Sequence, residues 1–101
     1  MELGTKLSFI EEIRDGIQKR YNDLKREVKN NGNITDGNKQ RAISYAKGMF
    51  ENANKNFLEV KPKVEAASKT DRVSKQIARH MTSIAKYKDK IYELCDYESK
   101  K

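Results

Sequence analysis

Several residue types are scarce or missing: the 101 residues include one cysteine, one proline, one histidine and no tryptophan. The single cysteine, Cys95, excludes an internal disulfide framework and fits a reducing compartment. No apolar run approaches the about 18 residues of a membrane-spanning helix, and the acidic residues in MELGTKLSFIEE argue against a signal peptide. These absences predict a cytoplasmic protein that neither enters a membrane nor depends on disulfides.

Groups that could carry catalysis are equally few. His80 lies beside an apolar stripe with no cysteine or aspartate placed locally to pair with it, and Cys95 falls on that stripe as a small buried hydrophobe, an exposed thiol being the alternative. Glu11 and Asp15 share a helix face, but without a third ligand they are more typical of a helix N-terminal half. We therefore predict no enzyme activity, no metal, no cofactor and no small-molecule substrate.

Two loop motifs are nearly present around residues 31–42. The segment 32–39 resembles a phosphate-binding loop, but no strand precedes it and no serine or threonine follows Lys39. Alternating Asn and Thr residues resemble calcium ligands, but Asp36 stands where that loop needs glycine and Ala42 where it needs glutamate. A turn between two helices is the better interpretation.

Three segments carry apolar residues at intervals of three and four, the spacing of an amphipathic helix. The second stripe runs straight through Gly48, which favours a continuous helix over a helix-turn-helix motif. Ile43, Phe50 and Leu58 widen the second stripe. The three stripes are Leu3, Leu7, Ile10, Ile13, Ile17, Tyr21, Leu24 and Val28; Ala42, Ala46, Met49, Ala53, Phe57 and Val60; and Val73, Ile77, Met81, Ile84, Tyr87, Ile91, Leu94 and Cys95.

Capping and breaking residues set the expected helix boundaries. Ser8 to Glu11 matches a capping box, with Thr5 as an earlier start, and Asp71 is a plausible cap for the third helix. Pro62 disfavours helical geometry at the preceding residue, so the second helix should end near residue 60. We predict one domain, residues 1–101, that is an all-α, antiparallel up-down-up bundle with helices at about 6–30, 36–60 and 70–97, the last alternatively starting at 62. Self-association through a shared stripe is left open.

Basic residues are concentrated in one part of the chain. Residues 61–90 hold nine Lys and Arg against three Asp and Glu, close to the whole net charge of +7. Arg72 precedes the apolar position Val73 by about 100° on a helix, so a basic row can run beside the core stripe without being buried. This predicted basic row comprises Arg72, Lys75, Arg79, Lys86 and Lys90.

The row suggests a binding function. Regularly spaced cations neutralise phosphates, and Tyr92 and Tyr97 could supply stacking or interface rings. We therefore expect a small non-catalytic binding protein whose basic third helix contacts a macromolecular polyanion, namely nucleic acid or a nucleoprotein complex. The alternative is a protein-protein interaction module, such as an immunity, inhibitor or adaptor protein, that occludes an acidic partner surface or pairs helices. A lysine-rich face that only promotes solubility, or that reflects genomic base composition, is also consistent with the pattern.

Overall fold

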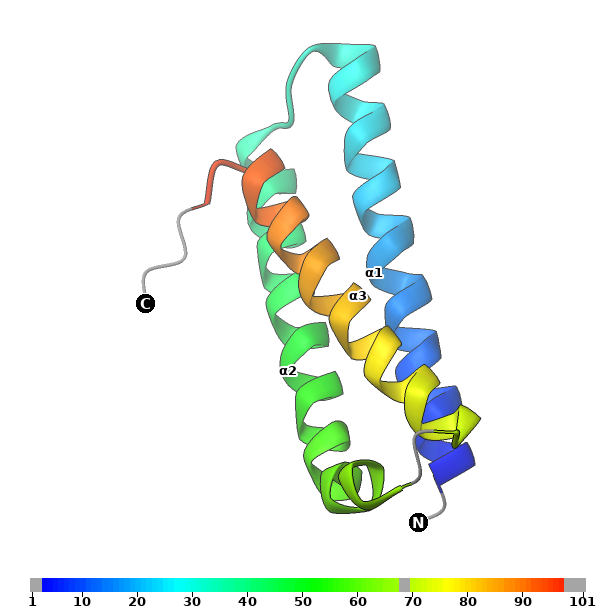
Figure 1. The fold of residues 1–101 in the computed structure, drawn as a ribbon. Coiled ribbons are helices and arrows are strands. Elements are labelled where there is room, and N and C mark those ends of the chain that lie inside the picture. The colour runs from blue at the N-terminus through cyan, green and yellow to red at the C-terminus, as the bar shows by residue number, and fades with distance from the viewer. Residues whose placement is uncertain (1–2, 68–69, 98–101) are drawn as a thin grey trace.

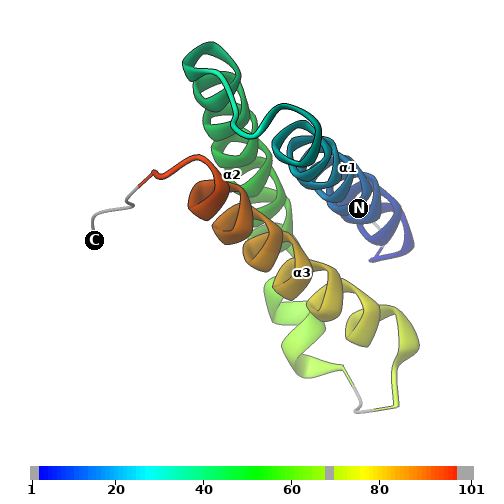
Figure 2. The ribbon, with the colours of Figure 1, turned by 90° about the horizontal axis from the view of Figure 1, so that it is seen from above.

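The part of the chain that the structure describes folds into three long helices that pack along one another. The computed structural model describes residues 3–67 and 70–97, which form α1 (Leu3–Asn31), α2 (Asp36–Ala66) and α3 (Arg72–Leu94). Consecutive helices run in opposite directions (Figure 1), and the view from above places α3 against both other helices (Figure 2). This confirms the predicted all-α antiparallel bundle. No helix in the described ranges is long and apolar enough to cross a membrane.

One hydrophobic core joins the three helices, and it is built from the predicted stripes. Isoleucines dominate the contributions of α1 and α3, whereas α2 contributes alanines that let its neighbours approach closely. Each fully buried isoleucine contributes about 1.5–3 kcal/mol of hydrophobic stabilisation, before any entropy cost is counted. The core side chains with no exposed surface are Ile10, Ile17, Ala42, Ala46, Ala53, Ile77, Ile84 and Ile91.

Four buried residues of the described ranges lie off the predicted stripes: Lys6, Ile34, Ser74 and Tyr92. Ile34, in the connection between α1 and α2, is only 4% exposed and covers one end of the core. Lys6 is 3% exposed, and its Nζ donates to Asn56 Oδ1 at 2.7 Å and to Glu59 Oε1 at 2.9 Å. Because a buried ammonium group needs such partners, these two bonds tie the start of α1 to the second half of α2.

The breaks between helices use the expected capping chemistry. Gly32 adopts a φ of +83°, a conformation that glycine reaches without steric cost, and Thr35 caps α2 by accepting from the Asn38 N–H. Asp71 caps α3, with its Oδ2 accepting from the Ser74 N–H at 3.0 Å. Hydrogen bonding from Ser74 lowers the pKa of the Asp71 carboxyl group.

The predicted end of the second helix near residue 60 is wrong, because α2 continues through Pro62 to Ala66. Residues 62–66 therefore belong to α2 and not to the start of the third helix. Proline inside a helix costs about 3 kcal/mol and leaves the carbonyl of Leu58 without its helical donor. Leu58 lies on the exposed side of α2, and Val64, in the turn that follows Pro62, packs against the hydrophobic core. The last turns of α2 bend out of line with the preceding ones, as expected at a proline (Figures 1 and 2).

Other details of the prediction also need correction. The first helix starts at Leu3, before both predicted caps, and Leu58 points to solvent instead of widening the second stripe. The third helix ends at Leu94 and not at residue 97. Asp96 adopts a φ of +54°, and the Tyr97 N–H donates back to the Tyr92 carbonyl, which together form a Schellman-type helix end. As predicted, α2 passes through Gly48 without a break.

Candidate functional site

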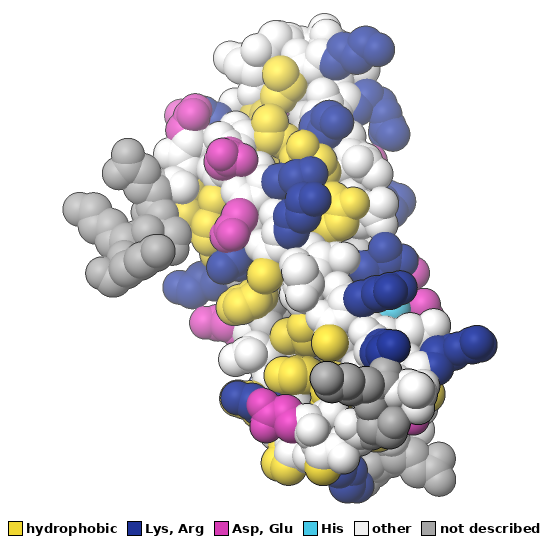
Figure 3. Space-filling view, viewed as in Figure 1, with side chains coloured by type: hydrophobic (Ala, Val, Ile, Leu, Met, Phe, Trp, Pro, Cys, Tyr) yellow, Lys and Arg dark blue, Asp and Glu magenta, His cyan; other side chains and the backbone are white. Residues whose placement is uncertain are grey.

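The predicted basic row is a continuous feature of the outer surface of α3. At 3.6 residues per turn its five members fall within roughly a sixth of the helix circumference, turned away from the buried Ile77 and Ile84. Four of them are exposed, and Lys90 is partly buried toward α1. Figure 3 views the bundle from the side of α3, where dark-blue side chains run down the flank that faces α1. The sequence pattern therefore predicted the exposed side of α3, although Lys90 is partly buried and Tyr92, outside the predicted apolar stripe, belongs to the core.

The exposed members of the row have no neutralising partner among the described residues. Arg72, Lys75, Arg79 and Lys86 form no ion pair or hydrogen bond with another side chain in residues 3–67 and 70–97. Lys88, outside the row, differs because its Nζ lies 4.2 Å from the centre of the Phe50 ring and 3.4 Å from Asp89 Oδ1. The row thus keeps its positive charge available for an external anion.

A hollow of about 280 Å³ lies at the N-terminal half of this row. Arginine offers a planar fork of donors that matches the oxygens of a phosphate, and lysine adds a mobile point charge. An oxyanion entering the hollow would meet three cations and an amide donor. The residues that line the hollow are Thr70, Arg72, Lys75, Gln76 and Arg79.

The C-terminal half of α3 is less purely basic. Asp89 and Glu93 are exposed there, and Figure 3 places acidic side chains on the flank opposite to that of the cations. The positive potential should therefore be strongest along the first half of the row and along the side that faces α1.

On the α1 side, Lys90 joins a cluster that the sequence did not indicate. The rings of Tyr21 and Tyr87 pack together with their centres 5.7 Å apart. Lys25 and Lys90 each place Nζ 5.4 Å from the centre of the Tyr21 ring, and Lys90 Nζ is also 5.5 Å from the Tyr87 ring. The spacings Tyr21 to Lys25 and Tyr87 to Lys90 are visible in the sequence, but only the packing of α1 on α3 brings the two pairs together.

The two tyrosines proposed as stacking or interface rings differ from each other. Tyr92 is only 8% exposed, and burial raises its pKa, so its ring is a core side chain and cannot serve as an open platform. Tyr97 is 40% exposed and packs edge-on against Tyr92, with ring centres 4.8 Å apart. Of the pair, only Tyr97 offers an accessible edge to a partner.

The reactive side chains are held in structural positions. His80 lies partly buried between α1 and α3, with Nε2 at 3.6 Å from Glu11 Oε2. Cys95 is 4% exposed, and burial raises the pKa of its thiol, as expected for an unreactive core cysteine. Within the described ranges no three His, Cys, Asp or Glu side chains are grouped to hold a metal ion.

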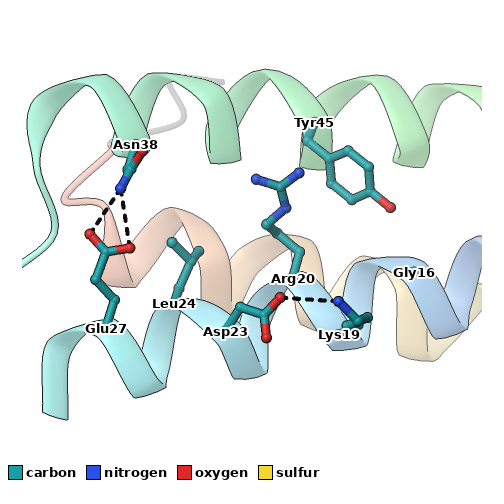
Figure 4. A pocket seen from close by; sticks show the side chains of 8 residues that line it. All are labelled: Gly16, Lys19, Arg20, Asp23, Leu24, Glu27, Asn38 and Tyr45. Carbon is teal, nitrogen blue, oxygen red and sulfur yellow. Dashed lines mark hydrogen bonds and ion pairs between the residues drawn. The ribbon is translucent and has the colours of Figure 1, made fainter. Parts of the chain in front are cut away.

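A polar groove of about 320 Å³ lies between α1 and α2 (Figure 4). The Arg20 guanidinium stacks 4.6 Å from the centre of the Tyr45 ring, and Glu27 accepts two hydrogen bonds from the Asn38 amide. The ring of Tyr45 can lie here because Gly16 has no side chain: a Cβ at that position would be 2.6 Å from the tyrosine hydroxyl oxygen. The groove contains cations and carboxylates in equal number, so it has no net attraction for an anion.

Comparison of the chain with protein-family models, with curated proteins and with solved structures finds no match. A function must therefore be inferred from the geometry and charge of the molecule.

Proposed function

We propose that this protein is a non-catalytic binding protein whose α3 face contacts a macromolecular polyanion, namely nucleic acid or a nucleoprotein complex. The observation that carries the proposal is the alignment of Arg72, Lys75, Arg79 and Lys86 on one exposed surface without carboxylate partners among the described residues. The hollow at the start of α3 adds a place that two arginines and a lysine line.

Electrostatics explain why a nucleic acid suits this face. Each phosphate that a lysine or arginine neutralises releases condensed counterions, so affinity depends strongly on the number of aligned cations and on salt. A chain with a net charge of +7 is also attracted to polyanions over long distances. The row holds no base-reading element, so contacts to the backbone, with little sequence preference, are the expected mode.

The alternative is a protein-protein module, such as an immunity, inhibitor or adaptor protein, that covers an acidic partner surface. Interfaces of that kind are usually anchored by a cluster of large apolar or aromatic side chains. The exposed large hydrophobic residues of the described chain are Phe9, Leu58 and Tyr97, one from each of three segments. This distribution supports a partner that is recognised mainly through its negative charge. We also propose that the protein acts in the cytoplasm, in keeping with its one buried free thiol.

Binding of a fluorescent oligonucleotide across a salt series tests the proposal. We expect the logarithm of affinity to fall with the logarithm of salt concentration with a slope of about −3 to −5, and the double variant Arg79→Glu/Lys86→Glu to abolish binding. Lys47→Glu/Lys55→Glu, which makes the same charge change on the exposed side of α2, is the matched control and should bind. Absence of wild-type binding at low salt would remove nucleic acid as the partner and favour the acidic protein surface.

A further inference from the structure

The tyrosine pair between α1 and α3 holds two lysines near one ring. Lys25 and Lys90 come from different helices, and each ammonium nitrogen is 5.4 Å from the centre of the Tyr21 ring. The two nitrogens are therefore no further apart than twice that distance. The arrangement brings a cation of α1 to the edge of the basic row on α3.

Aromatic support makes these lysines suitable for binding an anion. A cation above a tyrosine ring is held by about 0.5–1 kcal/mol at an exposed site, which limits the freedom of a long side chain without consuming its charge. Neither Lys25 nor Lys90 forms an ion pair in the described part of the chain. Each ammonium group thus keeps hydrogen-bond donors for a ligand.

We propose that Lys25 and Lys90 form a two-helix phosphate clamp, supported by Tyr21 and Tyr87, that extends the basic face of α3 onto α1. This inference rests on the proposed nucleic-acid function and names the ligand group, a backbone phosphodiester whose non-bridging oxygens accept from both lysines. The bound strand then crosses from the α3 row to α1 at this point. A contact that followed α3 alone would leave Lys25 unused.

Substitutions of Lys25 test the clamp separately from the basic row on α3. In oligonucleotide binding at low salt, we expect Lys25→Glu to weaken affinity by about tenfold or more, and Lys25→Ala to reduce the salt slope by about one. Lys19→Glu is the matched control, since it makes the same charge change on the same helix but on a surface turned away from α3. It should weaken binding by less than about threefold, which is the general cost of lost net charge.

Two further measurements test the clamp itself. A double-mutant cycle of Lys25→Ala and Lys90→Ala should be non-additive, with the second substitution costing less than the first, because both lysines share one phosphate. Tyr21→Phe keeps a ring face and should bind like the wild type, whereas Tyr21→Leu should weaken binding by about two- to fivefold without changing the net charge. Thermal unfolding of each variant confirms that it is folded.

The outcomes distinguish the clamp from the proposed function. Equal effects of Lys25→Glu and Lys19→Glu, with Arg79→Glu/Lys86→Glu still abolishing binding, would overturn the clamp and leave the α3 row as the site. Strictly additive losses in the cycle would likewise contradict a shared phosphate. No binding by the wild-type protein at low salt would overturn both proposals together.

Discussion

The two sides of α1 use lysine in different ways. Toward α2, the buried Lys6 is tied to Glu59 and Asn56. Toward α3, Lys25 lies over the Tyr21 ring and has no carboxylate partner among residues 3–67 and 70–97. We call these two surfaces the α1–α2 seam and the α1–α3 seam.

Lys6 and Lys25 differ in whether another side chain of the bundle neutralises their positive charge. On the α1–α2 seam a carboxylate neutralises the lysine, so the interaction contributes to the fold and attracts little from outside. On the α1–α3 seam an aromatic ring positions the cation but leaves its charge in place. The contact at Lys6 therefore serves the fold, whereas Lys25 keeps its charge for a ligand. On the α1–α2 seam an aromatic ring also holds Arg20, but Asp23 and Glu27 line the same groove.

Truncation of a buried core side chain should have the largest effect on the free energy of unfolding. Ile84 is fully buried on α3, and Ile84→Ala should lower the free energy of unfolding by about 2–5 kcal/mol, from lost transfer energy and the cavity left behind. Chemical denaturation measures the change. Lys86→Ala, two residues away on the outer face, should change stability by less than about 0.5 kcal/mol. Equal losses would mean that the two faces of α3 are not distinct.

Lysine truncations compare the seams directly. Lys6→Ala should cost on the order of 2 kcal/mol, because it removes a buried stem and the donor that Asn56 and Glu59 share. Lys25→Ala should change the free energy of unfolding by less than about 0.5 kcal/mol while weakening oligonucleotide binding. Urea unfolding and anisotropy on the same two proteins give both quantities. A loss of stability from Lys25→Ala as large as that from Lys6→Ala would contradict the view that Lys6 serves the fold and Lys25 serves binding.

Gly16 on the α1–α2 seam offers a smaller and more specific test. Alanine normally stabilises a helix interior by about 0.5–1 kcal/mol relative to glycine. Here the new Cβ would lie 2.6 Å from the Tyr45 hydroxyl oxygen but 4.0 Å from the ring carbon that bears it. Gly16→Ala should therefore stabilise the Tyr45→Phe variant and give little or no gain in the wild type. The same gain in both backgrounds would show that the hydroxyl does not restrict this position.

The smallest expected effect is a pH dependence from the Lys6 contact. A hydrogen bond from Lys6 and its positive charge lower the pKa of Glu59 below the usual 4.5. The stabilisation is therefore present above pH 4.5 and is lost as the pH falls through the lower pKa of the folded state. Glu59→Gln should be less stable than the wild type near neutrality, and the difference should close in acid. In a Lys6→Ala background the same substitution should have almost no pH-dependent effect.

Periodicity predicted most of the fold because one apolar stripe per helix leaves few other ways to bury the chain. The helix end predicted from Pro62 was wrong, because α2 continues to Ala66 and Val64 packs against the core. Periodicity also missed Lys6, whose burial depends on partners 50 and 53 residues away. The predicted end of the third helix was also wrong. The left-handed residue that ends α3 is Asp96 and not a glycine, so the sequence carried no clear stop signal there.

The candidate site was only partly predictable for a related reason. The row on α3 follows from the spacing of residues on a single helix, so Arg72 to Lys90 could be placed in advance. The burial of Tyr92 could not, because it depends on the neighbouring helix. Lys25 and Tyr21 could not be assigned to this surface from the sequence, because their role depends on which side of α1 meets α3.

Mapping of amide chemical shifts by NMR during titration with an oligonucleotide tests the central claim most directly. The largest changes should fall on Arg72, Lys75, Arg79 and Lys86, extend to Lys25, and leave the α1–α2 seam around Lys6 and Tyr45 unchanged. Changes centred on the α1–α2 seam, or no changes at low salt, would contradict the assignment of the α3 face as the binding surface.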